Sequence, residues 1–228
     1  MHYMNIKQAK FIERPNRFVA YANLDGIRVK CHVKNTGRCK ELLVPDAEIY
    51  LEDHGDRKDR KTRYSIVKVK KGDRLINMDS LAPNEVALEW MLKGGLYKDI
   101  ICLKREQKYG ASRFDFYYER KNGKKGFVEV KGVTLEEGNV AKFPDAPTLR
   151  GMKHIQELEQ ACADGYEANI IFVIQMEGVA CFEPNYDTHR EFGEALQRAK
   201  SKGVNILAVD CHVTETELEI NTKVHIRF

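Results

Sequence analysis

Residues 126–134 read GFVEVKGVT, a β-branched run that carries one acid and one lysine. Side chains of a strand alternate between its two faces, so Glu129 and Lys131 should share a face. A surface salt bridge would explain such a pair, and so would a metal-dependent active site. The acid-any-Lys pattern starts at five places, Asp56, Asp59, Glu106, Glu119 and Glu129. Only the copy at Glu129 is framed by β-branched residues and glycine, which singles it out.

The segment before this strand supplies a second acid. Residues 112–119 (SRFDFYYE) alternate, so Phe114 and Phe116 should share the core face and Asp115 should lie on the other. A turn at Asn122-Gly123 then predicts an antiparallel hairpin with the strand that follows. One register of that hairpin places Asp115 beside the acid and lysine of that strand, whereas a one-residue slip would separate them.

Two adjacent carboxylates repel each other unless a cation neutralises them, and a hard divalent ion accepts their oxygens. The cysteines and histidines lack zinc-site spacing, so the sequence favours Mg²⁺ or Mn²⁺ held by Asp115 and Glu129. Lys131 would orient or help deprotonate an attacking water and offset charge on a phosphate. Glu89 is a candidate fourth member through a bound water. The alternative is that all four are ordinary surface residues.

A predicted helix after Pro147 carries Arg150, Lys153 and His154 at positions i, i+3 and i+4. Residues at this spacing share one face of a helix, and this face suits phosphate contacts. The alternative is the polar side of an amphipathic helix with a hydrogen-bonded structural histidine.

Composition indicates a folded protein of 228 residues, 43% of them hydrophobic, with a net charge of +4. The start has no apolar run typical of a signal peptide and no segment is long enough to span a membrane, so we expect no membrane partner and a cytoplasmic location. Between Arg57 and Arg74, nine basic residues stand against two acids, which indicates a polyanion partner or a solvated loop.

Short strand patterns fill residues 1–80 and predict a small β-barrel or meander. Residues 81–228 predict the order helix, three strands, helix, strand, helix, strand, and therefore a mixed sheet with helices packed on it. This α+β order, with an acid on the second strand and ExK on the third, matches the PD-(D/E)xK nuclease core.

The chain also resembles the sugar fermentation stimulation protein (SfsA) family over essentially its full length. The segments that carry the resemblance include RPNRFVA (14–20), KNTG (34–37), KYGASRFDF (108–116), FVEVKGVTL (127–135) and FPDAPTLRGMKHIQEL (143–158). The resemblance implies an OB-like barrel, a restriction-endonuclease-like domain, DNA binding and a regulatory role in sugar (maltose) metabolism. Nucleic-acid contacts are then expected at Arg14, Arg17, Asn35, Thr36, Arg38, Arg57, Lys58, Arg60, Lys61 and Arg113, together with the helical set above.

Three functions remain open at this point. The protein could be a DNA-binding nuclease, a non-catalytic DNA-binding regulator on the same fold, or a metal-dependent hydrolase of small molecules. Clustered acids favour the first, because bare carboxylates would repel DNA, while the basic segment argues against the third. We expect DNA binding to weaken steeply with salt and to show little sequence preference.

Overall fold

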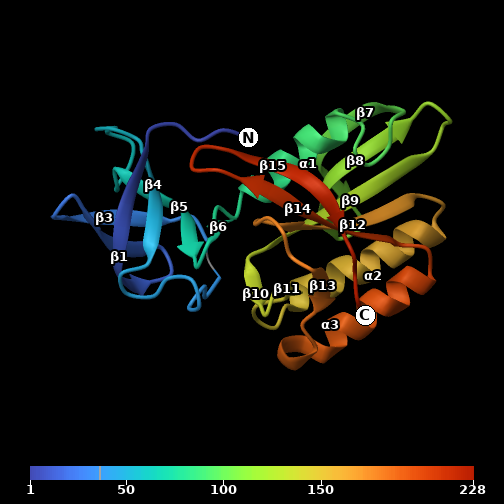
Figure 1. The fold of residues 1–228 in the computed structure, drawn as a ribbon. Coiled ribbons are helices and arrows are strands. Elements are labelled where there is room, and N and C mark those ends of the chain that lie inside the picture. Colours follow the sequence, from blue (N-terminus) through green and yellow to red (C-terminus); the bar gives the residue numbers. More distant parts are fainter. Residues whose placement is uncertain (36) are drawn as a thin grey trace.

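The computed structural model describes residues 1–35 and 37–228, which form two parts that lie side by side (Figure 1). Strands of the first part are β1 (Ile6–Asn16), β2 (Val19–Leu24), β3 (Ile27–Val33), β4 (Glu48–Asp53), β5 (Tyr64–Lys71) and β6 (Arg74–Asn77). Their order is β3-β2-β1-β4-β5-β6, and a parallel pairing of β3 with β5 closes the first five strands into a barrel. The strand pattern predicts a small barrel or meander, and the barrel is of the OB type that the family resemblance implies.

The second part contains a six-stranded sheet in the order β15-β14-β12-β9-β8-β7. Its elements are α1 (Ala82–Leu92), β7 (Ile100–Tyr109), β8 (Ser112–Arg120), β9 (Lys125–Val133), α2 (Leu149–Ala163), β12 (Glu167–Ile174), α3 (Tyr186–Ser201), β14 (Asn205–Val213) and β15 (Leu218–Val224). Strands β7, β8 and β9 form an antiparallel meander, whereas β9, β12 and β14 run parallel. The predicted mixed sheet is therefore confirmed.

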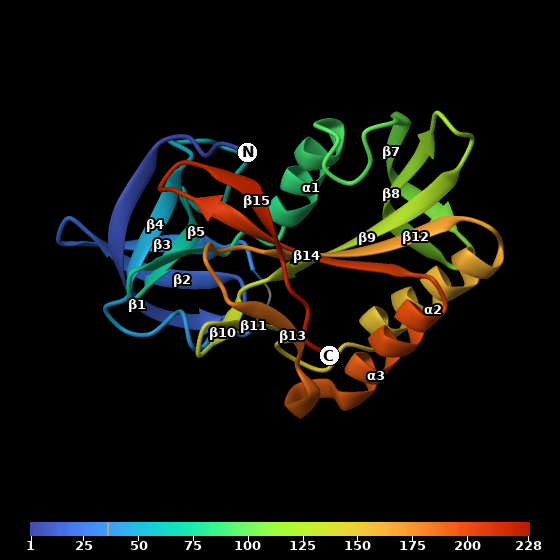
Figure 2. The ribbon, with the colours of Figure 1, turned by 45° about the vertical axis from the view of Figure 1, so that its right-hand side comes forward.

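Helix α1 covers one face of this sheet, and α2 and α3 cover the other (Figure 2). Helix α2 begins at Thr148, whose side chain accepts a hydrogen bond from the Gly151 amide, as expected for a helix cap. Helix α1 begins after Leu81, so Asn84 lies inside its first turn. The side chain of Asn84 is therefore free to contact the sheet that α1 covers.

A small second sheet has the order β10-β11-β13 and was not predicted. Its strands are β10 (Leu135–Glu137), β11 (Val140–Phe143) and β13 (Cys181–Pro184). Segments of three or four residues are too short to show the alternation by which strands are recognised in a sequence. Strand β15 was also missed. Among the described residues, no helix is long and apolar enough to cross a membrane.

The two parts meet at a buried polar network. The side-chain amide of Gln175, which follows β12, donates to the main-chain and side-chain oxygens of Asn77 and to the main-chain oxygen of Asp79. Asn77 in turn donates to the hydroxyl of Tyr3. All four residues are buried, so every one of these polar groups depends on its partner inside the protein.

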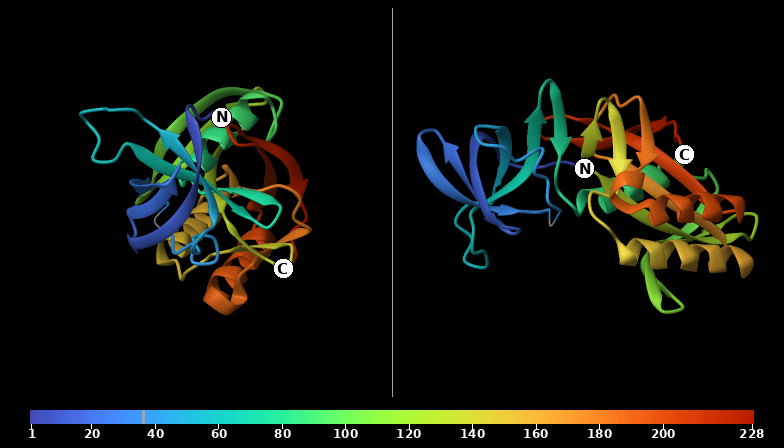
Figure 3. Two further views of the ribbon diagram at one scale, coloured as in Figure 1. Left: turned by 60° about the vertical axis from the view of Figure 1, so that its left-hand side comes forward. Right: turned by 90° about the horizontal axis from the view of Figure 1, so that it is seen from below.

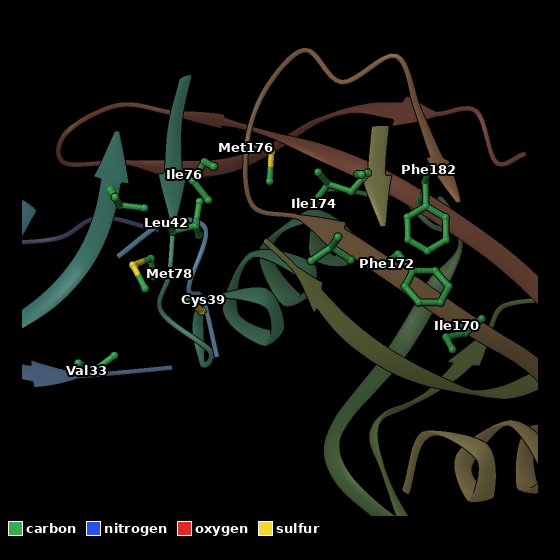
Figure 4. Packing of buried hydrophobic residues seen from close by; sticks show 14 of the residues in the cluster. Val33, Cys39, Leu42, Ile76, Met78, Ile170, Phe172, Ile174, Met176 and Phe182 are labelled. Atoms are coloured by element: carbon green, nitrogen blue, oxygen red, sulfur yellow. The ribbon is translucent and has the colours of Figure 1, made fainter. Parts of the chain in front are cut away.

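Apolar packing is continuous across the same junction, as Figure 4 shows. Ile76 and Met78, at the end of the barrel, belong to one cluster with Ile174 and Met176 of the second part. The N-terminal residues also join the two parts, since the Tyr3 amide donates to Thr216 in the loop before β15 (Figure 3). The barrel is thus anchored to the mixed domain.

We predict that Gln175→Leu lowers the free energy of unfolding by about 1–2 kcal/mol, because it removes three buried hydrogen bonds, although Asn77 Oδ1 and the Asp79 carbonyl each keep a main-chain amide as donor. Chemical denaturation measures this change. Gln160→Leu is the matched control, since Gln160 is exposed and bonds only Asp164, and its effect should stay within about 0.5 kcal/mol. Equal effects of the two substitutions would contradict the importance of the junction.

Candidate metal-dependent active site

The site forms where β8 separates from β9. The two strands pair as far as Phe116 and Val128, and the ladder stops before Asp115. Oδ2 of Asp115 then accepts the main-chain amide of Val130 at 2.7 Å, in place of a main-chain carbonyl. On the neighbouring strand β7, Glu106 has a positive φ of 54°, which is uncommon for a residue other than glycine. Both strands therefore depart from regular geometry beside Asp115.

This irregularity changes the faces of the aromatic residues around Asp115. Phe114 packs beside α2, with ring centroids 5.3 Å from Phe127 and 6.3 Å from His154. Phe116 belongs to the core on the α1 side. The prediction that Phe114 and Phe116 share one face is therefore wrong, because it assumed a regular strand through Asp115.

Glu129 is the centre of the hydrogen bonds in the site. Its Oε1 accepts Lys131 Nζ at 2.6 Å and also contacts Nδ1 of His154. Arg150 Nε lies 3.4 Å from the other ring nitrogen of the histidine. Since arginine can only donate, we assign the proton of His154 to Nδ1, from which it is donated to Glu129. The side chain of Glu129 is only 4% exposed.

The two acids have opposite electrostatic environments. Burial, and then the negative charge of Glu129, raise the pKa of Asp115 from 3.8 to about 6. Burial acts in the same direction on Glu129, but the hydrogen bond from His154 and the positive charge of Lys131 outweigh it and lower the pKa of that carboxyl. Glu129 therefore carries its charge at neutral pH, whereas ionisation of Asp115 is opposed.

The donor set suits a hard cation. Oε2 of Glu129 is buried and has no hydrogen-bond partner among the described residues, a costly arrangement for a carboxylate oxygen. Asp115 has donors on both oxygens, from the main chain and from the amide of Asn84 at 2.8 Å. No three His, Cys, Asp or Glu side chains in the described chain form a metal-ligating group. A cation here would rely on two carboxylates, with main-chain oxygens or water as further ligands.

A basic cavity of about 410 Å³ opens over Asp115. Its walls are formed by Glu106, Lys108, Ala111, Ser112, Arg113, Asp115 and Arg150. Arg113 and Arg150, both expected from the sequence to contact phosphates, line this cavity. Lys153 lies beside the cavity and donates to the carbonyl of Ala111. His154 is buried, so it acts on Glu129 and does not face a phosphate.

Glu89 lies away from this cluster. Its Oε2 accepts the N-terminal ammonium of Met1 at 2.7 Å, and the α1 side chain that reaches Asp115 is Asn84. The two helix positions are five residues apart and so are rotated by about 140° from each other. The structure thus brings Asn84 of this helix into contact with Asp115 and pairs Glu89, the residue expected from the sequence, with the N-terminus.

The basic residues predicted on the barrel differ in what their side chains do. Arg14 donates to four main-chain carbonyls, those of Arg17, Asn35, Gly37 and Arg38, so its guanidinium holds a loop together and is not directed at a ligand. Thr36 lies outside the described residues. The side chains of Arg17 and Arg38 are exposed and line one cavity of about 490 Å³.

The first part of the predicted basic run, Arg57 to Arg63, lies in the loop between β4 and β5, whereas its remaining cations lie on β5 and β6. Arg57 pairs with Asp59, and Arg60 donates to Thr62 and Ser65, so these two cations are engaged within the loop. Lys58 and Lys61 are exposed. In OB folds, the loop between the fourth and fifth strands is one of those that contact nucleic acid.

Two residues of the site were not predicted from the sequence. Asn84 is near Asp115 only because α1 lies across the end of the meander, and no local pattern gives that position. Lys108 joins Arg113 in the basic cavity because β7 and β8 pair these two residues directly. The register of that hairpin was the signal that could have identified Lys108.

An OB-type barrel followed by a mixed α/β domain, with an acid on one strand and ExK on the next, defines the restriction-endonuclease-like class of protein. A family model described as "Sugar fermentation stimulation protein RE domain" matches residues 81–217, and one described as "SfsA N-terminal OB domain" matches residues 12–78. The chain therefore belongs to the sugar fermentation stimulation protein (SfsA) family.

Individual relatives agree with this family. The sugar fermentation stimulation protein homolog of Clostridium beijerinckii is 56% identical over 226 residues, which cover 99% of each chain. The homolog of Ruminiclostridium cellulolyticum is 56% identical over 227 residues and both chains are covered completely. The solved structure of Pyrococcus furiosus SfsA in complex with Ca²⁺ is 28% identical, with a TM-score of 0.89 over 100% of this chain and 98% of that chain.

Asp115→Asn should stabilise the metal-free protein at pH 8, on the order of 2 kcal/mol, because it removes a buried charge beside Glu129. The folded protein binds a proton at Asp115 below pH about 6, and the unfolded chain does so only below about 3.8. Wild-type stability should therefore rise as pH falls through this window, and the advantage of the variant should shrink by pH 5.

Thermal unfolding in the presence of a chelator, from pH 5 to pH 8, measures this difference. Glu106→Gln is the matched control, because Glu106 lines the same cavity but is exposed. A variant that is less stable than wild type at pH 8 would contradict the electrostatic account of Asp115.

Proposed function

We propose that this protein is a divalent-metal-dependent phosphodiesterase that acts on DNA. The observation that carries the proposal is a pair of acids in which Asp115 lines a basic cavity and feels the charge of Glu129, whose buried Oε2 has no partner among the described residues. A protein that only bound DNA would gain nothing from two acids in this position. A small-molecule hydrolase would have no use for the exposed lysines of the β4–β5 loop.

Asp115 and Glu129 are the residues that would hold the metal. The relative from Pyrococcus furiosus was solved in complex with Ca²⁺, which supports a divalent ion, and we propose Mg²⁺ or Mn²⁺ for this chain. Such an ion polarises a phosphodiester oxygen and lowers the pKa of a water molecule. The orphaned Oε2 of Glu129 gives this ion a ligand that no described protein group uses.

The other residues of the site have distinct tasks. Lys131, held by Glu129, orients the attacking water and offsets the negative charge that grows on the phosphate. The hydrogen bond from His154 orients Glu129 and favours its ionised form. Arg113 and Arg150, on the walls of the cavity, bind the phosphates on either side of the reacting group.

The family name connects this chain with sugar fermentation, and we propose that it contributes there as a DNA-binding protein of the cytoplasm. All six cysteines are free, which agrees with a reducing compartment. A non-catalytic regulator is the second candidate, because Lys131 is neutralised by Glu129 and exposed cations of the barrel, such as Lys58 and Lys61, could bind DNA without it.

Cleavage of labelled single- and double-stranded DNA with Mg²⁺ or Mn²⁺ tests the proposal. Wild type should cleave only with the metal, and Lys131→Ala and Asp115→Asn should each reduce the rate about 100-fold or more. Lys125→Ala, on the same strand but in an exposed position outside the site, is the control. Tight binding without any cleavage would leave the non-catalytic regulator as the function.

Binding measured with Ca²⁺ in place of the catalytic metal tests the basic cavity. Wild-type affinity should fall steeply with salt and depend little on sequence, because phosphate contacts dominate. The double variant Arg113→Ala/Arg150→Ala should reduce the slope of log K against log salt by about 2. Arg190→Ala, an exposed arginine on α3, should leave the slope unchanged. A strong preference for one operator with a shallow slope would contradict this model of binding.

A further inference from the structure

A second cavity, of about 280 Å³, lies between the barrel and the mixed domain. Strand β9 leads into it, because Gly132, directly after Lys131, forms part of its wall. The described lining is Asn35, Gly37, Ser80, Gly132, Val133, Thr134, Leu135, Lys142, Phe143, Asp145 and Gln175. The basic cavity reaches the same strand only through Asp115, which lines that cavity and accepts the main-chain amide of Val130, two residues before Gly132.

A buried side-chain amide, held in place by hydrogen bonds, lines the junction cavity. Gln175 is 1% exposed, and its amide nitrogen is fixed by the oxygens of the domain junction. That arrangement fixes the carbonyl oxygen Oε1 as well, and no described residue donates to it. A Cβ atom on Gly132 would lie 2.7 Å from Oε1 and from Cγ of Pro83, so any other residue at 132 would press on this carbonyl.

The barrel supplies the opposite wall. The Arg14 guanidinium holds the carbonyls of Asn35 and Gly37, and the Asn35 side chain accepts the Gly37 amide. Gly37 packs so closely to Asp145 that a Cβ atom would lie 2.8 Å from its carboxylate. The side-chain amide of Asn35, from the barrel, and the carboxylate of Asp145, from the mixed domain, thus line the same cavity.

The chemistry of this lining fits a nucleobase. Fixed amide and carboxylate groups are the partners that read the hydrogen-bonding edges of bases, and the side chains of Val133, Leu135 and Phe143 add apolar surface for the ring. A phosphate fits less well, because Asp145 would repel it and Lys142 already pairs with Glu137. The cavity volume is near the lower end for small-molecule sites.

We propose that the junction cavity receives the base of an unpaired nucleotide next to the phosphodiester at Lys131. This inference rests on the proposed function and narrows its substrate to DNA with a single-stranded segment, since a base inside a duplex is stacked and paired. It also gives the barrel a role in the reaction, because the site is incomplete without Asn35 and Gly37.

A single-stranded oligonucleotide carrying one 2-aminopurine, bound to Lys131→Ala protein in the presence of Ca²⁺, tests the inference. Scanning the position of 2-aminopurine should find one position whose fluorescence changes on binding. Thr134→Phe, which fills the cavity, should abolish that change and weaken single-strand binding about tenfold, with duplex binding unaltered. Thr134→Ser, which keeps the space, should behave as the parent protein does.

The outcomes separate the two proposals. Normal binding, with no fluorescence change at any position and no effect of Thr134→Phe, would overturn the base site and leave the nuclease proposal intact. Failure of the parent protein to bind any DNA would overturn both. Loss of duplex and single-strand binding together in Thr134→Phe would show a general disruption of the domain junction and would also overturn the base site.

Discussion

One hydrogen bond, from the main-chain amide of Val130 to the carboxylate of Asp115, sets the geometry of the site. A side chain there takes the place of a main-chain carbonyl, so β8 and β9 stop pairing and the sheet opens. The opening turns Phe114 toward α2 and makes room for the basic cavity. Every later feature of the site, from the pKa of Asp115 to the orphaned oxygen of Glu129, lies at this break in the ladder.

The two carboxylates have different hydrogen-bond donors, and this difference explains why a cation is expected. Glu129 has Lys131 and His154 as donors and keeps its charge, whereas Asp115 has only neutral donors, from Asn84 and Val130. Bringing both charges together in a buried place is unfavourable. A divalent ion removes the repulsion and uses the oxygen that no other described group engages. Stability and function therefore oppose each other at Asp115, as is common at active sites.

Much of this architecture follows from the sequence, and the failures have local causes. That Asp115 lies near Glu129 and Lys131 was predictable, because alternation and the Asn122-Gly123 turn fix a hairpin register. The face of the sheet on which Phe114 lies was not predictable, because the alternation of residues does not show that β8 stops pairing with β9 at Asp115. Glu89 was expected in the site because an acid suits a metal, while the contact of Asn84 with Asp115 depends on the long-range packing of α1. Arg14 was expected to bind nucleic acid, and its four carbonyl partners arise only once the loop folds.

The central claim is that Asp115 and Glu129 together hold one divalent ion. Anomalous diffraction from crystals grown with Mn²⁺ tests it most directly. The account predicts a single strong peak between the two carboxylates, within bonding distance of Glu129 Oε2, that is absent in Asp115→Asn crystals. A peak elsewhere, or none in wild-type crystals at saturating Mn²⁺, would contradict the account.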